Sequence, residues 1–174
     1  MKWKPIVVFL LIGAALAGWW RWQNPGSSLA NTSGMISAIN GPDLMTHVRS
    51  LNSPLVLVNF WASWCAPCKA EFPALLGIKE KWAARGLKVV FVSIDEIPDL
   101  PAAEEFLRQT GVTFPTYSKG DQDPGFIRDI FPEWQGSVPA SLLIGPGGKL
   151  VDAWEGDSTP DELEARVAQH MKGT

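Results

Sequence analysis

Residues 60–75, FWASWCAPCKAEFPAL, contain both cysteines of this 174-residue chain, Cys65 and Cys68. The residues that lead into the pair, PLVLVNFWA at 54–62, form a nearly continuous apolar run, which is typical of a strand buried on both faces. The residues that follow, 66–85, have a helical composition. The sequence therefore places the two cysteines at the junction between a buried strand and the start of a helix.

A second apolar run, GLKVVFVSID at residues 86–95, follows the predicted helix, and its first residue, Gly86, suits the left-handed position that ends helices. Strand, helix and strand in this order predict a right-handed βαβ unit with parallel strands. The other predicted elements are a helix at 101–110, a loop and short helix within 118–134, a hairpin of strands at 141–145 and 149–156, and a capped helix at 159–171. The sum is an α/β fold with a mixed central sheet flanked by helices.

Residues 1–22 are expected to form a membrane anchor. The stretch PIVVFLLIGAALAGWW at 5–20 carries no charge, and with its flanking tryptophans it reaches about 20 residues, enough to cross a bilayer. The basic residues before it place the N-terminus in the cytoplasm. A signal peptide cleaved after ALA at 15–17 is the alternative. Either way the remainder is exported, as a flexible linker at 23–35 and a domain at 36–174.

Composition narrows the classes of function. Apolar residues make up 46% of the chain and charged residues 19%, as in a folded domain. The net charge of −3 provides no excess of basic residues for nucleic acid, so no nucleic-acid partner is expected.

The two cysteines favour redox chemistry over a structural role. A disulfide that closes so short a loop removes little chain entropy and stabilises poorly. A structural zinc site needs four ligands, and the two histidines, His47 and His170, lack the spacing of a zinc motif. We interpret both as ordinary surface histidines and expect neither a metal nor a separate cofactor. Copper remains an alternative, because Cu(I) accepts two thiolates.

A working pair would divide its tasks by position. At a helix N-terminus, Cys65 would face unpaired backbone N–H groups and the positive end of the helix dipole, which favour its thiolate. Cys68, one turn further, would resolve the mixed disulfide that Cys65 forms with a partner. The residues between them, Ala66 and Pro67, include no histidine to stabilise the thiolate, so the pair is expected to be reducing.

The segment FWASWCAPCKAEFPAL resembles the active-site segment of thioredoxin-fold proteins, and the continuation Cys68-x-x-Glu71-x-Pro73 resembles their TlpA-like branch, which includes membrane-anchored reductases of cytochrome c maturation. The resemblance extends over about residues 36–171. It implies that Cys65 is the nucleophile and Cys68 the resolving cysteine. It further implies four substrate-binding residues: Trp64, Pro67, Val138 and Pro139.

Within SVPASLLIG, the resemblance implies that Pro139 follows a cis peptide bond beside the cysteines, and that Val138 offers its backbone to an extended substrate. The residues just before this segment, IFPEWQGS at 130–137, depart from the family's usual pattern. This departure bears on the identity of the substrate more than on the chemistry.

The resemblance also directs the search for a proton acceptor. Thioredoxin has a buried aspartate where this chain has Asn59, which cannot accept a proton. TlpA-like reductases place an acid after the next strand instead, where Asp95 and Glu96 lie here. We predict Glu96 as a buried carboxyl that takes the proton of Cys68, with Asp95 as the alternative.

Together these features predict an extracytoplasmic thiol–disulfide oxidoreductase that reduces protein disulfides, with apocytochrome c as the substrate that the resemblance implies. Because the chain has no nucleotide-binding loop, its electrons are expected from a membrane thiol donor. The expected location is the bacterial inner membrane, with the domain facing the periplasm or the outer face of the cytoplasmic membrane. A disulfide oxidase or isomerase and a copper chaperone on the same fold are the alternatives.

Overall fold

The predicted strand–helix–strand unit is the centre of the computed structural model, which describes residues 34–119, 126 and 130–171. It consists of β2 (Val56–Trp61), α3 (Ala66–Trp82) and β3 (Lys88–Ser93). β2 and β3 are parallel, and all six residues of β2 are buried, as its apolar sequence predicted. After α3, a 3₁₀ turn over Ala83–Arg85 leads to Gly86, whose φ of 94° confirms its role at the end of the helix.

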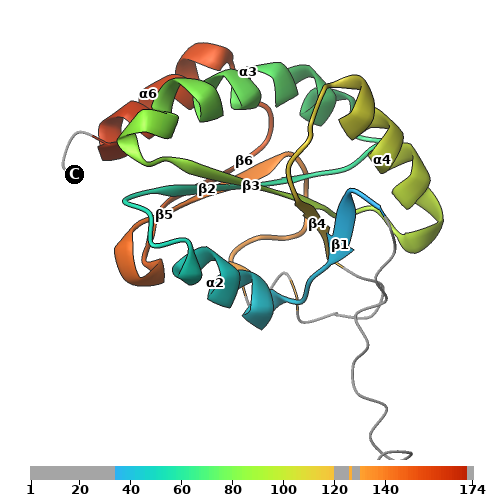
Figure 1. Ribbon diagram of the computed structural model, residues 1–174, viewed down its shortest axis with the longest axis horizontal. Coiled ribbons are helices and arrows are strands. Elements are labelled where there is room, and N and C mark those ends of the chain that lie inside the picture. The colour runs from blue at the N-terminus through green and yellow to red at the C-terminus, as the bar shows by residue number, and fades with distance from the viewer. Residues whose placement is uncertain (1–33, 120–125, 127–129, 172–174) are drawn as a thin grey trace, which may run out of the picture. The chain divides into compact units, whose positions relative to one another are not determined.

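The sheet has six strands in the order β1-β4-β3-β2-β5-β6 (Figure 1). β1 (Ile36–Ala38) and β4 (Thr116–Ser118) extend the parallel part. β5 (Ala140–Ile144) pairs antiparallel with β2 and with β6 (Leu150–Glu155). The prediction of a mixed sheet is therefore confirmed. The arrangement puts β5 directly beside the strand that leads into the cysteines.

Helices cover both faces of the sheet (Figure 1). α3, α4 (Leu100–Gln109) and α6 (Pro160–Met171) contribute side chains to one apolar cluster, and α2 (Gly41–Ser50) contributes to the other. The α6 N-terminus has the predicted capping box, since the Thr159 hydroxyl accepts from Glu162 N–H while the Glu162 carboxylate accepts from Thr159 N–H.

Three elements, β1, α2 and β4, were not predicted from the sequence. Two of these are strands of only three residues, too short to show an alternating pattern. The sequence did contain a signal for the start of α2, because asparagine is a preferred N-cap residue. In the structure Asn40 is the N-cap, and its Oδ1 accepts a hydrogen bond of 2.8 Å from Asp43 N–H. The loop predicted from residue 118 begins later, because Ser118 belongs to β4.

The predicted anchor and almost all of the predicted linker lie outside the described residues. Across 34–119, 126 and 130–171, no helix is long and apolar enough to cross a bilayer. Of the short helix predicted within 118–134, Phe126 and residues 130–134 are described. Phe126 and Ile130 are helical and buried in the cluster that α2 joins, whereas residues 131–134 are not helical.

Candidate active site

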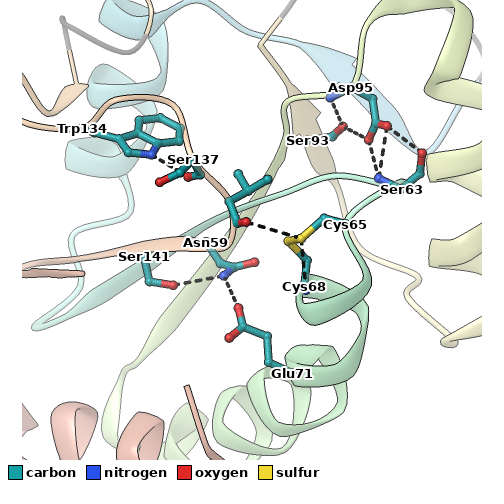
Figure 2. Close-up of a disulfide and its surroundings, with 11 residues drawn as sticks. Asn59, Ser63, Cys65, Cys68, Glu71, Ser93, Asp95, Trp134, Ser137 and Ser141 are labelled. Atoms are coloured by element: carbon teal, nitrogen blue, oxygen red, sulfur yellow. Dashed lines mark hydrogen bonds between the residues drawn. A yellow bond between two sulfur atoms is a disulfide. The ribbon is translucent and has the colours of Figure 1, made fainter. Parts of the chain in front are cut away.

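Cys65 and Cys68 form a disulfide at the N-terminus of α3 (Figure 2). Cys65 is the N-cap residue, and its Sγ accepts a hydrogen bond of 3.2 Å from the backbone N–H of Cys68. This is the geometry in which a serine or aspartate usually caps a helix, with sulfur in the place of oxygen. A thiolate at Cys65 would therefore meet an oriented N–H and the positive end of the helix dipole.

Both cysteines are buried, although residues beside them in the sequence are exposed. Cys65 and Cys68 are 4% and 1% exposed, whereas Trp64 is 62% exposed and Pro67 is also exposed. Trp61, three residues earlier, is only 1% exposed, and its ring lies 5.3 Å from that of Phe72. The resemblance implied Trp64 as a substrate-binding residue, and its exposure leaves it accessible to a partner.

The peptide bond between Val138 and Pro139 is cis, as the resemblance implied. It comes just before β5, the strand paired with β2, and so reaches the site from a part of the chain 73 residues away. The carbonyl oxygen of Val138 lies 3.6 Å from Cys65 Sγ. The backbone carbonyl that precedes the cis proline and the sulfur of Cys65 thus face each other.

A buried polar chain lies beneath the disulfide (Figure 2). Asn59 of β2 donates from Nδ2 to Glu71 Oε1 at 3.1 Å and to Ser141 Oγ at 3.0 Å. Three elements, β2, α3 and β5, meet through this amide. Within the described part of the chain, Asn59 Oδ1 and Glu71 Oε2 are buried without a hydrogen-bond partner. A proton on the Glu71 carboxyl would convert one of these two acceptors into a donor.

Glu71 is the titratable group that the sequence analysis missed. Burial raises its pKa from the usual 4.5 to about 7, and the hydrogen bond from Asn59 opposes part of that shift. The signal was present in the spacing, because Glu71 follows Cys68 by three residues and therefore lies on the same side of α3. A carboxyl that titrates near neutral pH can accept or return a proton during thiol exchange.

The predicted role of Glu96 is not supported by its position. Its side chain is 60% exposed and forms an ion pair of 2.9 Å with Lys119, so the expectation of a buried carboxyl is wrong. Glu96 directly follows the buried Asp95 and precedes the short 3₁₀ helix over Ile97–Asp99.

Asp95, the alternative, is buried but fully engaged (Figure 2). Its carboxylate accepts from the backbone N–H of Ser63 at 2.9 and 3.1 Å, from the Ser63 hydroxyl at 2.6 Å and from the Ser93 hydroxyl at 2.6 Å. Since Ser63 lies two residues before Cys65, Asp95 holds the turn that precedes the disulfide. The arrangement assigns Asp95 to positioning that turn.

The two histidines are half-buried, and each lies near a side chain other than the cysteines. His47 Nε2 is 3.2 Å from the Tyr117 hydroxyl, and His170 Nε2 is 3.8 Å from Asp152 Oδ2. Among the residues that the structure describes, no group of three or more histidine, cysteine and acidic side chains has the arrangement of a metal site.

Replacing Glu71 should change how stability depends on pH. Because folding raises this pKa, the protonated carboxyl stabilises the fold at low pH, and that contribution is lost as pH rises through about 7. From about pH 5 to about pH 8, the free energy of unfolding of the oxidised wild type, measured with urea, should fall by about 2–3 kcal/mol more than that of Glu71→Gln. The control Glu80→Gln, at an exposed position of the same helix, should follow the wild type. Parallel pH profiles for wild type and Glu71→Gln would show that this carboxyl does not titrate near neutral pH.

Removing Asp95 should weaken the fold at the site. Asp95→Ala leaves the Ser63 amide and two hydroxyls without an acceptor, so the free energy of unfolding in denaturant should fall by about 2–4 kcal/mol. Asp99→Ala, at an exposed position of the same segment, should change it by about 0.5 kcal/mol or less. If the two substitutions lowered the free energy of unfolding equally, Asp95 would not have the positioning role assigned to it.

The chain is similar to several thiol–disulfide exchange proteins. It is 32% identical over 109 residues to the thiol-disulfide oxidoreductase ResA of Oceanobacillus iheyensis, a match that covers 63% of this chain and 53% of that protein. It is 32% identical over 119 residues to the thiol:disulfide interchange protein HelX of Rhodobacter capsulatus, covering 68% of this chain and 61% of that protein. The chain thus spans between half and two thirds of the length of these relatives.

Solved structures agree with the fold. A thiol:disulfide interchange protein of the thioredoxin family from Chlorobium tepidum superposes with a TM-score of 0.58 at 25% identity, over 70% of this chain and 83% of that one. A secreted disulfide oxidoreductase of Mycobacterium tuberculosis, homologous to DsbE of E. coli, superposes with a TM-score of 0.52 at 26% identity, over 69% and 84%. The model of the AhpC/TSA family matches residues 45–153, more than half of the sequence. The resemblance predicted from FWASWCAPCKAEFPAL is confirmed: the chain has a thioredoxin fold and belongs to the AhpC/TSA family.

Proposed function

We propose that this protein is an extracytoplasmic thiol–disulfide oxidoreductase that reduces disulfides in other proteins through Cys65 and Cys68. The observation that carries the proposal is the contact between Cys65 Sγ and the Val138 carbonyl oxygen, 3.6 Å apart, at a helix N-terminus beside a cis proline. A reactive sulfur next to the backbone before β5 suits an extended peptide that carries a disulfide. The names of the ResA and HelX relatives support the same chemistry.

The first step uses the helix N-terminus. In the reduced protein, the Cys65 thiolate attacks one sulfur of a partner's disulfide, that bond breaks, and the partner's other sulfur leaves as a thiolate that takes a proton from water. A mixed disulfide between Cys65 and the partner remains. The Cys68 N–H that points at Cys65 Sγ stabilises the thiolate before the attack.

The second step uses the buried carboxyl. Cys68 must lose its proton in a site that is 1% exposed to solvent, and Glu71 on the same side of α3 can receive that proton. The Cys68 thiolate then attacks Cys65 Sγ and displaces the partner's second sulfur. Cys65 and Cys68 end as a disulfide, and the partner has gained two electrons.

The direction of exchange follows from what surrounds the thiolate. Neither Ala66 nor Pro67 carries a charge that would stabilise the reduced form, so the disulfide is the preferred state and the dithiol is a reductant. The competing proposal, an oxidase or isomerase, requires a strongly stabilised thiolate. The measured potential separates the two.

Location and partners belong to the same proposal. Residues 1–22 would anchor the chain in the bacterial inner membrane, residues 23–35 would form the tether, and the domain at 36–174 would face the periplasm or the outer face of the cytoplasmic membrane. A secreted structural relative is consistent with export. A membrane thiol donor would return the two electrons after each cycle, and apocytochrome c is the proposed substrate.

Trapping tests the roles of the two cysteines. With Cys68→Ala, mixed disulfides to partners should accumulate through Cys65, because nothing displaces them. Cys65→Ala should trap none, since Cys68 is buried. Non-reducing gels of exported extracts, with mass spectrometry of the cross-linked cysteine, measure both. Adducts attached through Cys68 in the Cys65→Ala protein would reverse the assigned roles.

The reduction potential tests the direction of exchange. Equilibration with glutathione buffers should give a value nearer to the about −270 mV of thioredoxin than to the about −120 mV of DsbA. Pro67→His, which adds a cation beside the thiolate, should raise the potential by about 30 mV or more, and Pro67→Ala separates that charge effect from the loss of the proline ring. A wild-type potential near −120 mV, that of DsbA, would establish an oxidase instead.

A further inference from the structure

We infer that Trp134 is a positioning residue that presents the backbone of Val138 to peptide substrates through a hydrogen bond from its indole. The inference rests on the proposed function, and it concerns the segment before Pro139 that departs from the family's usual sequence. The hydrogen bond joins Trp134 Nε1 to the carbonyl oxygen of Ser137 at 2.7 Å.

Trp134 is fixed from several sides. It is 3% exposed, its ring centroid lies 4.5 Å from that of Phe60 in β2, and its backbone N–H donates to Phe131 O at 3.0 Å. Phe60 lies one strand residue after Asn59, so the indole packs on the strand that leads directly into the cysteines. The donor at its edge is therefore held in one place relative to the disulfide.

The indole determines where the next peptide group points. The bond between Ser137 and Val138 is trans, so the Ser137 carbonyl and the Val138 N–H point in opposite directions from one plane. Because Trp134 holds the carbonyl on its own side, the Val138 N–H points away from the indole. Figure 2 shows Ser137 between the Trp134 indole and the disulfide.

Polar groups on both sides of Val138 are already paired, whereas the Val138 N–H is not. Ser137 Oγ bonds to the Glu155 carboxylate, and the Pro139 carbonyl accepts from Gly156 N–H at 2.8 Å. Within the part of the chain that the structure describes, the Val138 N–H has no hydrogen-bond partner, and its carbonyl faces Cys65 Sγ at 3.6 Å. One donor and one acceptor of Val138 are thus left for an extended peptide whose cysteine meets Cys65.

The experiment separates backbone docking from sulfur chemistry. Trp134→Phe keeps an aromatic ring against Phe60 but removes the N–H donor. Trp82→Phe is the matched control, since Trp82 Nε1 donates to Glu164 Oε1 at 3.0 Å in the other apolar cluster, on α3 and α6. Each reduced protein is assayed with a short synthetic disulfide-bonded peptide and with dithiobis(nitrobenzoate), a small aryl disulfide that has no peptide backbone.

Trp134→Phe should lower kcat/KM for the peptide by about 3- to 10-fold, mainly through KM, because one net hydrogen bond that orients Val138 is lost. Its rate with the aryl disulfide and its reduction potential should match those of the wild type, and Trp82→Phe should match the wild type throughout. Benzothienylalanine at position 134, which keeps both rings and replaces the N–H by sulfur, should behave as Phe does and covers the case in which the Phe variant folds poorly.

Equal losses on both substrates, or no loss on the peptide, would overturn the inference while leaving the proposed function in place. A wild-type protein that reduces neither substrate would contradict the proposed function itself. Normal peptide kinetics with benzothienylalanine would likewise show that the indole N–H has no part in docking.

Discussion

The site depends on one local constraint: Cys65 is the N-cap of α3, and its sulfur receives the N–H of Cys68. The buried strand β2 delivers the chain to that point, and the carboxylate of Asp95 fixes the turn through Ser63. Pairing of β5 with β2 then brings the Val138 carbonyl against the same sulfur. If any of these elements were displaced, the sulfur of Cys65 would no longer lie beside the backbone of Val138, where the substrate peptide is proposed to bind.

The same geometry gives the two cysteines opposite environments. Cys65 meets the charge-stabilising end of a helix beside exposed Trp64, whereas Cys68 lies one turn deeper, above a polar chain that ends in Glu71. The helix N-terminus favours a thiolate at the outer sulfur, and the raised pKa of Glu71 suits the proposed proton acceptor for the inner one. In the proposed mechanism, attack and resolution thus follow from the positions of the two cysteines in the helix.

Local pattern was enough to predict the βαβ unit, the glycine at its helix end and the position of the cysteine pair, because each depends on residues close in sequence. The cis bond before Pro139 came only from resemblance, since most X–Pro bonds are trans. The exposure of Glu96 and the burial of Glu71 could not be predicted, because burial depends on tertiary packing, which composition does not show. The bond from Trp134 to Ser137 likewise needs the tertiary packing of the indole on Phe60.

The central claim, that the helix N-terminus makes Cys65 the nucleophile, is tested most directly by alkylating the reduced protein across a pH series and locating the label by mass spectrometry. The account predicts that Cys65 is labelled first, with a pKa below the about 8.5 of a free thiol, and that Cys68 stays protected. Preferential labelling of Cys68, or a pKa of Cys65 at or above that of a free thiol, would contradict it.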